Sequence, residues 1–243
     1  MSSDILVTEF QGRTFTTLGE WSGRKIVGRA FDGCVFHSCY LGMQGLAERP
    51  ILRNIRLQGC QLLGRGGCTL KGAIVEDVLV EDLKTDGLVQ TWATVFKHVT
   101  LKGKIGELMF SSLFHPGEPT SKFQRAIEKA NADYYATVDW ALDIREAELE
   151  DIDCRGLPAR LVRRNPETQM MLTRDRVLAN QDAINAGGQY WAGLIKFFLG
   201  QDANYPYADA ICVVPRKPPR GTDRNALTNG IEALRKAGVA EPD

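Results

Sequence analysis

The densest group of side chains that could take part in chemistry is acidic and lies in the segment IVEDVLVEDLKTDG. The group consists of Glu76, Asp77, Glu81, Asp82 and Asp86. Carboxylates gathered in this way can bind a basic partner, although a run of charges is more often a solvated face. We therefore take Glu76, Asp77, Glu81 and Asp82 as candidate partner-binding residues, with a solvated face as the alternative.

A second group is basic and lies in the segment RLVRR, where Arg160 is followed by Arg163 and Arg164. Guanidinium groups bind phosphate or carboxylate groups in a two-pronged geometry. We take Arg163 and Arg164 as candidate partner-binding residues. The alternative is that these arginines form ion pairs with three nearby acids, Glu146, Glu148 and Glu150.

A third group combines aromatic and acidic residues, namely Tyr134, Tyr135, Asp139, Trp140 and Asp143. In a helix, Asp139 and Asp143 are four residues apart and share one face. Two carboxylates on one face can perform acid–base work or hold a metal ion. Alternatively, the aromatic residues of this group anchor the helix to the rest of the protein.

Local motifs for catalysis or cofactor binding do not occur in this sequence. It has no phosphate-binding loop, no dinucleotide fingerprint, no G-x-S-x-G and no HExxH. The arrangement Cys34, His37 and Cys39 has metal-ligating residue types, but no CxxC pair accompanies it. We expect no metal ion, no cofactor and no assigned catalytic residue.

The elements that carry these residues show an internal period of five, which fits neither a helix nor a flat strand. Large apolar residues occur at strict steps of five at Trp21, Ile26, Phe31, Phe36, Leu41, Leu46 and Ile51. The phase then slips by one, and the period resumes at Leu52, Leu57 and Leu62, at Leu70, Val75 and Val80, and at Phe96 and Leu101. The residue two places earlier is often small or apolar, as at Cys34, Cys39, Cys60 and Cys68.

This pattern resembles the pentapeptide-repeat family, whose repeats read roughly small–polar–Leu/Phe–polar–polar. The likeness covers roughly residues 21 to 110, and the phase slips near residues 52, 65 and 90 imply loops or bulges. The resemblance implies a right-handed four-sided β-helix with about 20 residues in each coil, whose coils stack because none buries its apolar side alone. The alternative fold is an ordinary β-sandwich of short strands.

In such a β-helix the bulky centre of each repeat and the small residue before it point inward. Cys34 and Cys39 then face the interior while His37 faces solvent, so the three do not converge on a metal ion. The pairs Glu76–Asp77 and Glu81–Asp82 leave two neighbouring sides and wrap a corner.

Beyond the repeats, the proline-containing segment HPGEPT predicts a loop. The following segment, SKFQRAIEKANADYYATVDWAL, predicts a helix that begins with a Ser121–Gln124 capping box. It would lie along a face of the repeats or cover their open end. The pentads AELED and IDCRG, centred on Leu149 and Cys154, suggest that the chain returns to the repeats over residues 144–156.

The rest of the chain predicts a small α/β part. We expect a hairpin around Asn165–Pro166, helices in DRVLANQDAINAG and QYWAGLIKFFLG, and a buried strand in DAICVVP. A last helix runs from Asp223 to a stop at Gly238. The expected fold is therefore mainly β: a pentapeptide-like β-helix over residues 1–115, then added helices and the α/β C-terminal part over residues 116–243.

The overall composition limits which partners and which cellular compartment we expect. The chain of 243 residues carries 30 basic and 30 acidic residues, so nothing steers it towards nucleic acid or anionic membranes. Neither a signal peptide nor a membrane-spanning run is recognisable. The six cysteines are expected to be reduced thiols, and we expect a cytoplasmic protein.

We expect a non-enzymatic scaffold that binds a protein partner, and a homodimer is conceivable. Within the resembling family, protecting a host enzyme or neutralising a toxin are roles of this kind. The alternative is an enzyme with a carboxylate-based site between the repeats and the C-terminal part. The slight excess of basic over acidic residues in residues 1–110 argues against mimicry of a DNA duplex.

Overall fold

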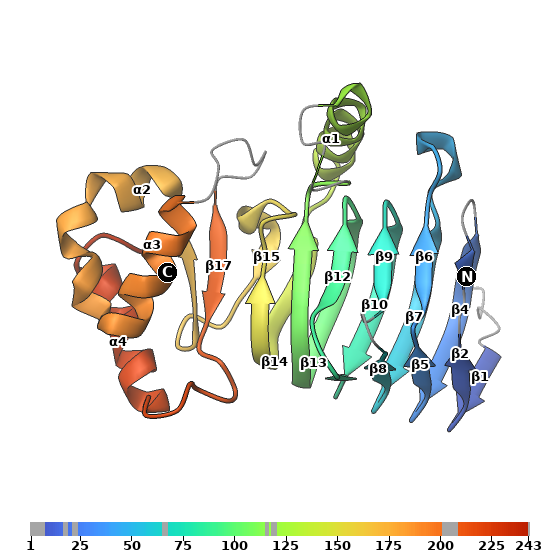
Figure 1. Cartoon of the computed structure of the whole chain (residues 1–243), viewed down its shortest axis with the longest axis horizontal. Helices are drawn as coiled ribbons and strands as arrows, with labels where there is room; N and C mark the ends of the chain where they lie inside the picture. The colour runs from blue at the N-terminus through green and yellow to red at the C-terminus, as the bar shows by residue number, and fades with distance from the viewer. Residues whose placement is uncertain are drawn as a thin grey trace, which may run out of the picture.

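A computed structural model describes residues 8–16, 19–20, 24–64, 68–114, 117, 121–200 and 209–242. The protein is mainly β, with parallel strands in a curled sheet and a few helices (Figure 1). The strands follow one another along the long axis of the molecule, and most of the helices gather beyond the C-terminal end of this stack.

The chain runs repeatedly through the same series of strands; we call each circuit a pass and the whole set of passes the stack. The largest sheet is built from strands that occur once in each pass. One row contains β1 (Thr8–Gln11), β4 (Lys25–Asp32), β7 (Ile51–Gln58), β10 (Ile74–Glu81), β13 (Val95–Ser111), β14 (Leu142–Asp153) and β15 (Val162–Arg163). From β13 the sheet continues through β12 (Val89–Trp92), β9 (Thr69–Lys71), β6 (Tyr40–Gly42) and β3 (Gly19–Glu20). A second sheet contains β2 (Thr14–Thr16), β5 (Val35–His37), β8 (Gln61–Leu63) and β11 (Lys84–Thr85). Strand pairing in both sheets is parallel, so each pass lies directly on the previous one.

The register of these strands explains the five-residue period. The centres Phe31, Leu57, Val80 and Leu101 are aligned across four neighbouring strands. In the same way Leu52 aligns with Ile26, whereas Ile51 aligns with Lys25, so the predicted phase slip at Leu52 is confirmed. The extra residues form the loop that contains the 3₁₀ helix η1 (Leu46–Glu48). Leu46, predicted as an inward centre, lies in this 3₁₀ helix and is 37% exposed, so that assignment was wrong. Trp21 lies outside the described residues.

Left-handed residues bend the long strands at matching positions. The residues that follow the aligned positions Val27, Arg53, Glu76 and Lys97 all have positive φ: Gly28 (62°), Asn54 (54°), Asp77 (54°) and His98 (54°). A second aligned set contains Gly12, Gly33, Gly59 and Asp82, each directly after a strand, and Gly103 within β13. Glycine, asparagine, aspartate and histidine are the residue types that enter this conformation most readily. Each pass therefore turns at the same places, which keeps the passes in register.

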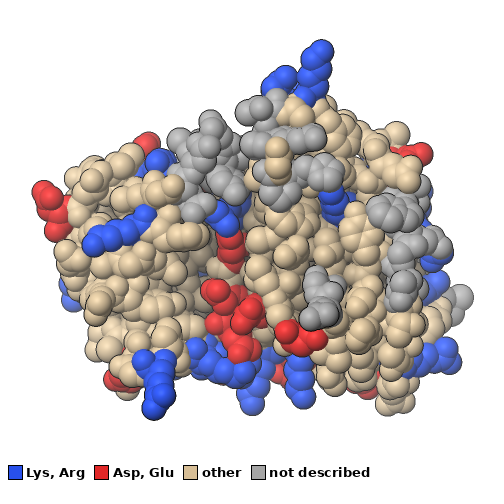
Figure 2. Space-filling view, in the orientation of Figure 1, with Lys and Arg blue, Asp and Glu red and all other residues tan. Residues whose placement is uncertain are grey.

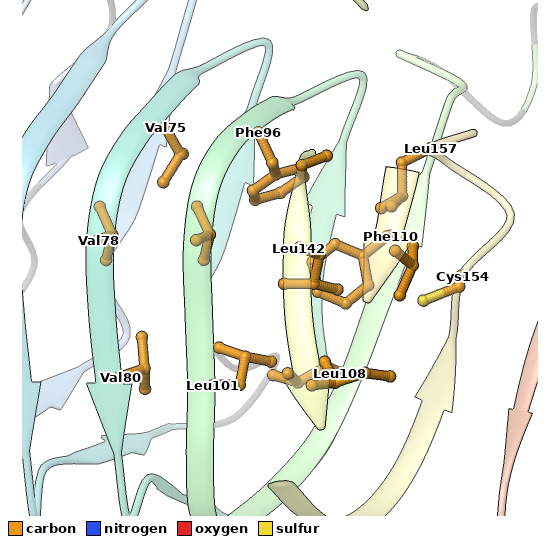
Figure 3. Close-up of a cluster of buried hydrophobic side chains, with 14 of the residues drawn as sticks. Val75, Val78, Val80, Phe96, Leu101, Leu108, Phe110, Leu142, Cys154 and Leu157 are labelled. Atoms are coloured by element: carbon orange, nitrogen blue, oxygen red, sulfur yellow. The ribbon is translucent and has the colours of Figure 1, made fainter. Parts of the chain in front are cut away.

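The interior of the curled sheet is apolar (Figure 3). Many predicted inward centres lie in it, together with apolar residues that the period of five did not predict, such as Leu108 and Leu142. Valine and leucine side chains fill the middle passes, as at Val75, Val80 and Leu101. Towards the N-terminus the centres are aromatic: Phe10 stacks on Phe31 at 5.2 Å between ring centroids. Like residues thus meet like residues on neighbouring passes, which gives the core a repetitive packing.

Helix α1 (Lys122–Tyr135) lies against the pass formed by β13. Its predicted cap is confirmed, because the Ser121 side chain accepts a hydrogen bond from the backbone N–H of Gln124. The Gln124 side chain instead contacts the strand end, accepting from the Phe114 N–H at 2.8 Å. The helix ends at Tyr135, so the prediction that Asp139 and Asp143 share a helical face was wrong.

Arg49 joins this helix to the sheet. Its guanidinium is largely buried and donates to the backbone oxygens of Gly72, Ala73 and Ala93 at 2.7, 3.2 and 3.1 Å. It also donates to the Asn131 Oδ1 of α1 at 2.8 Å. Burial lowers the pKa of Arg49, because the charged form loses water. These hydrogen bonds compensate that loss and tie the loop before β7 to both the sheet and the helix.

After α1 the chain rejoins the stack through β14 and β15, and Leu149 and Cys154 are buried as predicted. The C-terminal part follows with β16 (Gln169–Leu172), α2 (Arg174–Ala179), α3 (Gln189–Gly200), β17 (Ala210–Val213) and α4 (Arg224–Lys236). The hairpin predicted around Asn165–Pro166 was wrong: β15 pairs with β14, whereas β16 pairs antiparallel with β17. The reason is that the turn at Asn165–Pro166 leads the chain away from β15, so β16 does not pair with the strand that precedes it.

The C-terminal part covers the last pass of the stack. Its own core gathers around Trp191, whose indole N–H donates to the Leu227 oxygen at 2.9 Å. Hydrogen bonds join it to β14, from Gln169 to the Ile144 oxygen at 2.8 Å and from the Arg216 N–H to the Leu149 oxygen at 2.6 Å. In the part of the chain that the structure describes, no helix combines the length and the apolar character needed to span a membrane.

The bends give a direct prediction for two glycines that both have open space around their Cα atoms. Gly33 has φ +58°, whereas Gly45 is extended with φ −152°. Gly33→Ala should lower the free energy of unfolding by about 1–2 kcal/mol, because alanine is strained in the left-handed region. Gly45→Ala, the matched control, should be neutral or slightly stabilising. Chemical denaturation measures both, and equal effects would contradict the assigned bend.

Candidate functional site

His98 is the centre of a group of charged and aromatic side chains on one bend of the stack. Its Nδ1 lies 3.1 Å from the Asp77 Oδ1, and its Nε2 lies 2.7 Å from the Asp139 Oδ1. The imidazole is partly exposed and both carboxylates are more exposed still. We call Asp77, His98, Asp139, Trp140 and Arg163 the His98 corner.

The backbone places Asp77, His98 and Asp139 in one row. Asp77 and His98 occupy the same left-handed position on neighbouring strands, β10 and β13. The His98 N–H donates to the Trp140 oxygen at 3.2 Å, which places the segment after α1 on the next pass. Residues from three parts of the sequence therefore form one row along the axis of the stack.

Trp140 extends the row by aromatic contacts. The His98 and Trp140 rings are 4.7 Å apart between centroids and tilted by 33°. The guanidinium carbon of Arg163 lies 4.3 Å from the Trp140 ring centroid, which is a cation–π contact. Trp140 is thus held between two groups that can be cationic.

The carboxylates near this row are engaged by basic groups. The hydrogen bond from His98 holds the pKa of Asp139 below its ordinary value. Burial acts to raise the pKa of Asp143, but the hydrogen bonds from Arg145 and the charge of Arg163 outweigh it, so the net pKa is lowered. The Arg145 Nη2 lies 2.6 Å from the Asp143 Oδ2. Both carboxyl groups therefore remain ionised at neutral pH.

This geometry favours an ion-paired surface over acid–base catalysis. Each ring nitrogen of His98 faces a carboxylate oxygen within hydrogen-bond distance. Neither nitrogen is therefore free to accept a proton from a substrate. Asp139 and Asp143 likewise have separate partners, so they do not act as a pair.

The predicted acidic residues are interleaved with basic ones. Glu76 is aligned between Arg53 and Lys97 on the neighbouring strands. It forms an ion pair with Arg53 and accepts a hydrogen bond from the Tyr134 hydroxyl at 3.0 Å. Burial, and secondarily the Glu76 charge, raises the pKa of Tyr134. The carboxylate of Glu76 is therefore already neutralised within the protein.

The predicted acidic residues Glu81 and Asp82 lie at the second bend, at the end of β10. Glu81 lies 3.5 Å from the Lys102 ammonium and 3.9 Å from Arg56. Asp82 has φ 52°, and its Oδ1 accepts from the Lys104 N–H at 2.8 Å. Asp82 thereby stabilises the bend itself.

The structure thus brings Asp77 and Arg163 together with Asp139 in the His98 corner. Glu76 pairs with Arg53 instead, and Glu81 and Asp82 lie around the following bend. Arg164 is half-buried directly after β15. The pairing expected between the RLVRR arginines and Glu150 is replaced by ion pairs of Glu150 with Arg216 at 3.0 Å and Lys217 at 2.5 Å.

His98 was missed by the sequence analysis, although a signal existed. It stands two residues after the inward centre Phe96, as Asp77 stands two residues after Val75. Among the described residues no three His, Cys, Asp or Glu side chains are grouped as metal ligands. His37 is exposed while Cys34 is fully buried, so they face different directions, as predicted. Cys39, which was also predicted to face the interior, is only partly buried.

No protein-family model, curated protein or solved structure matches this chain.

The contact of His98 with Asp139 predicts a specific titration behaviour. His98→Asn keeps a residue type that tolerates positive φ but removes the imidazole that hydrogen-bonds to Asp139, so the pKa of Asp139 should rise towards its ordinary value. Because the folded-state pKa of Asp139 is lowered, its stabilising contribution exists above the unfolded-state pKa. It is lost as the pH falls through the folded-state pKa.

Carboxyl-carbon NMR titration of both proteins measures this change. Asp143 is the internal control, since Arg145 should hold its pKa down in the variant as well. An unchanged Asp139 titration would show that His98 is not its partner in solution.

Proposed function

We propose that the curled sheet is a right-handed four-sided β-helix of the pentapeptide-repeat type. The support is the aligned left-handed positions, which divide each long strand into two sides, and the separate rows through β5 and β6 that supply two more. Phe31 and Phe36 pack against the apolar core, and Leu41 is aligned with Leu70, which also packs against it. These positions agree with the centres of such repeats.

We further propose that this protein is a non-enzymatic scaffold for a protein partner, with protection of a host enzyme or neutralisation of a toxin as possible roles. The observation that carries this proposal is the His98 corner: an outward row of fixed side chains on a rigid stack. Tryptophan and arginine dominate the binding energy of many protein interfaces. Trp140 and Arg163 are held in place before a partner arrives, which lowers the entropy lost on binding.

The distribution of charge favours a protein partner over nucleic acid. Figure 2 shows acidic groups near the middle of one face, with basic groups directly beside them. The formal net charge is zero, and the acidic residues Glu76 and Glu81 pair with bases of neighbouring strands. A nucleic-acid partner or a duplex mimic requires a broad surface of one sign.

Affinity capture from nuclease-treated lysate of the source cell, with quantitative mass spectrometry, tests the scaffold proposal. The wild-type protein should retain one partner at near-equal stoichiometry. The combined variant Trp140→Ala, Arg163→Ala should reduce its recovery at least about tenfold, since each hot-spot truncation costs on the order of 1–2 kcal/mol. The matched control is Lys129→Ala on the exposed face of α1, which should leave recovery unchanged.

Circular dichroism must first show that both variants are folded. Equal recovery with the combined variant would contradict the assignment of this surface. Absence of any stoichiometric partner would contradict the scaffold proposal, and Asp139→Asn with Asp143→Asn would then be the variant for activity screens.

A further inference from the structure

The six cysteines of the chain fall into three pairs. Because Val35 aligns with Gln61, the preceding residues Cys34 and Cys60 lie on neighbouring passes. In the same way Tyr40 aligns with Thr69, which places Cys39 opposite Cys68. Cys154 of the last pass and Cys212 of the C-terminal part interact electrostatically. All six are free thiols.

The pair Cys39–Cys68 is aligned on neighbouring strands. The Thr69 N–H donates to the Cys39 oxygen at 2.9 Å, and the Cys39 thiol contributes to the raised pKa of Cys68, after the larger effect of burial. Neighbouring parallel strands are about 4.8 Å apart, which falls within the Cα separation of about 4.4–6.8 Å that a disulfide spans.

Access to solvent distinguishes this pair from the other two. Cys34 and Cys60 are 0% exposed, and Cys154 and Cys212 are also buried. Cys39 is partly exposed at the surface of a bend, whereas Cys68 is 7% exposed behind it. Burial raises the pKa of Cys68 to about 11, so its thiol stays protonated at neutral pH. Cys39 is therefore the sulfur that a small oxidant reaches first.

We propose that Cys39 and Cys68 form a peroxide-sensitive dithiol, a modification site in which Cys39 is attacked first and Cys68 resolves the product into a disulfide. In the first step the Cys39 sulfur forms a bond to one oxygen of hydrogen peroxide. The O–O bond breaks and the second oxygen leaves as water, which produces a sulfenic acid on Cys39.

In the second step the Cys68 sulfur attacks the Cys39 sulfur. The S–S bond forms, the S–O bond breaks, and the hydroxyl leaves with the Cys68 proton as a second water molecule. The two thiols lose two electrons in total, and the peroxide accepts them.

The disulfide joins β6 to β9 across the irregular loop that carries η1 and Arg49. In the reduced protein the two thiols donate weakly to the oxygens of Phe15, at 3.6 Å, and Phe36, at 3.4 Å. Oxidation replaces these weak contacts with one covalent link between passes. It should therefore slow local opening of the N-terminal passes, which amide hydrogen exchange detects as greater protection.

The test is oxidation of the intact protein with dilute hydrogen peroxide, followed by alkylation of the remaining thiols and non-reducing tryptic mapping. Trypsin separates residues 30–53, which carry Cys34 and Cys39, from residues 57–65 with Cys60 and residues 66–71 with Cys68. The expected product links 30–53 to 66–71 within one chain, with fragmentation placing the bond at Cys39. It should form at least about tenfold faster than a link within either other pair.

Two variants make the result specific. Cys68→Ala should leave Cys39 as a sulfenic acid that a dimedone probe traps, whereas Cys34→Ala should leave the 30–53 to 66–71 link intact. A link from 30–53 to 57–65, a disulfide between two chains, or oxidation of Cys39 to sulfinic acid without any link in the wild-type protein would each overturn the proposal.

Discussion

The structure depends on one backbone constraint: four consecutive passes enter the left-handed region at the same position. Parallel strands can stack in register only if each pass bends where the previous one did, and the bends at Gly28, Asn54, Asp77 and His98 satisfy this requirement. A left-handed residue costs free energy unless it is glycine or one of the few types that tolerate it. The stacked hydrogen bonds and the shared apolar core compensate that cost.

The same constraint creates the candidate site. A bend turns its side chain outward, and residues at aligned bends therefore stand in a row along the stack. Asp77 and His98 meet in this way, and the segment after α1 adds Asp139 and Trp140 to the row. The His98 corner is thus a consequence of how the passes bend, and its rigidity follows from the rigidity of the stack.

Much of the stack was readable in the sequence because inward residues recur at fixed intervals. The centres Phe31 and Leu57, and the phase slip between Ile51 and Leu52, were predictable from apolar residues alone. The row of residues at His98 was not predictable in this way. Asn54, Asp77 and His98 are separated by unequal numbers of residues, so their alignment can be predicted only if the length of each loop is known. The end of α1 at Tyr135 was also hidden, because the apolar spacing continues through Val138 and Ala141, which are buried against the sheet instead.

The helices and the C-terminal part complete the molecule by covering surfaces that the stack leaves open. Arg49 and Asn131 join α1 to the strand ends, and Gln169 and Arg216 join the C-terminal part to β14. These contacts are polar and depend on single residues, unlike the repetitive apolar core. The His98 corner joins both kinds of segment, since Asp77 and His98 belong to the repetitive strands whereas Asp139 and Trp140 come from the segment after α1.

The most direct test of the stacked-pass account is a distance measured along the stack. Gln11 is aligned through Asp32, Gln58, Glu81 and Lys102 with Glu146, and both ends of this row are exposed. Spin labels introduced at positions 11 and 146 through non-natural amino acids, which spare the native cysteines, can be read by double electron–electron resonance. Five interstrand steps predict a narrow distribution centred at about 24 Å before allowance for the labels. A broad distribution, or a centre far from this value, would contradict the stacking of successive passes.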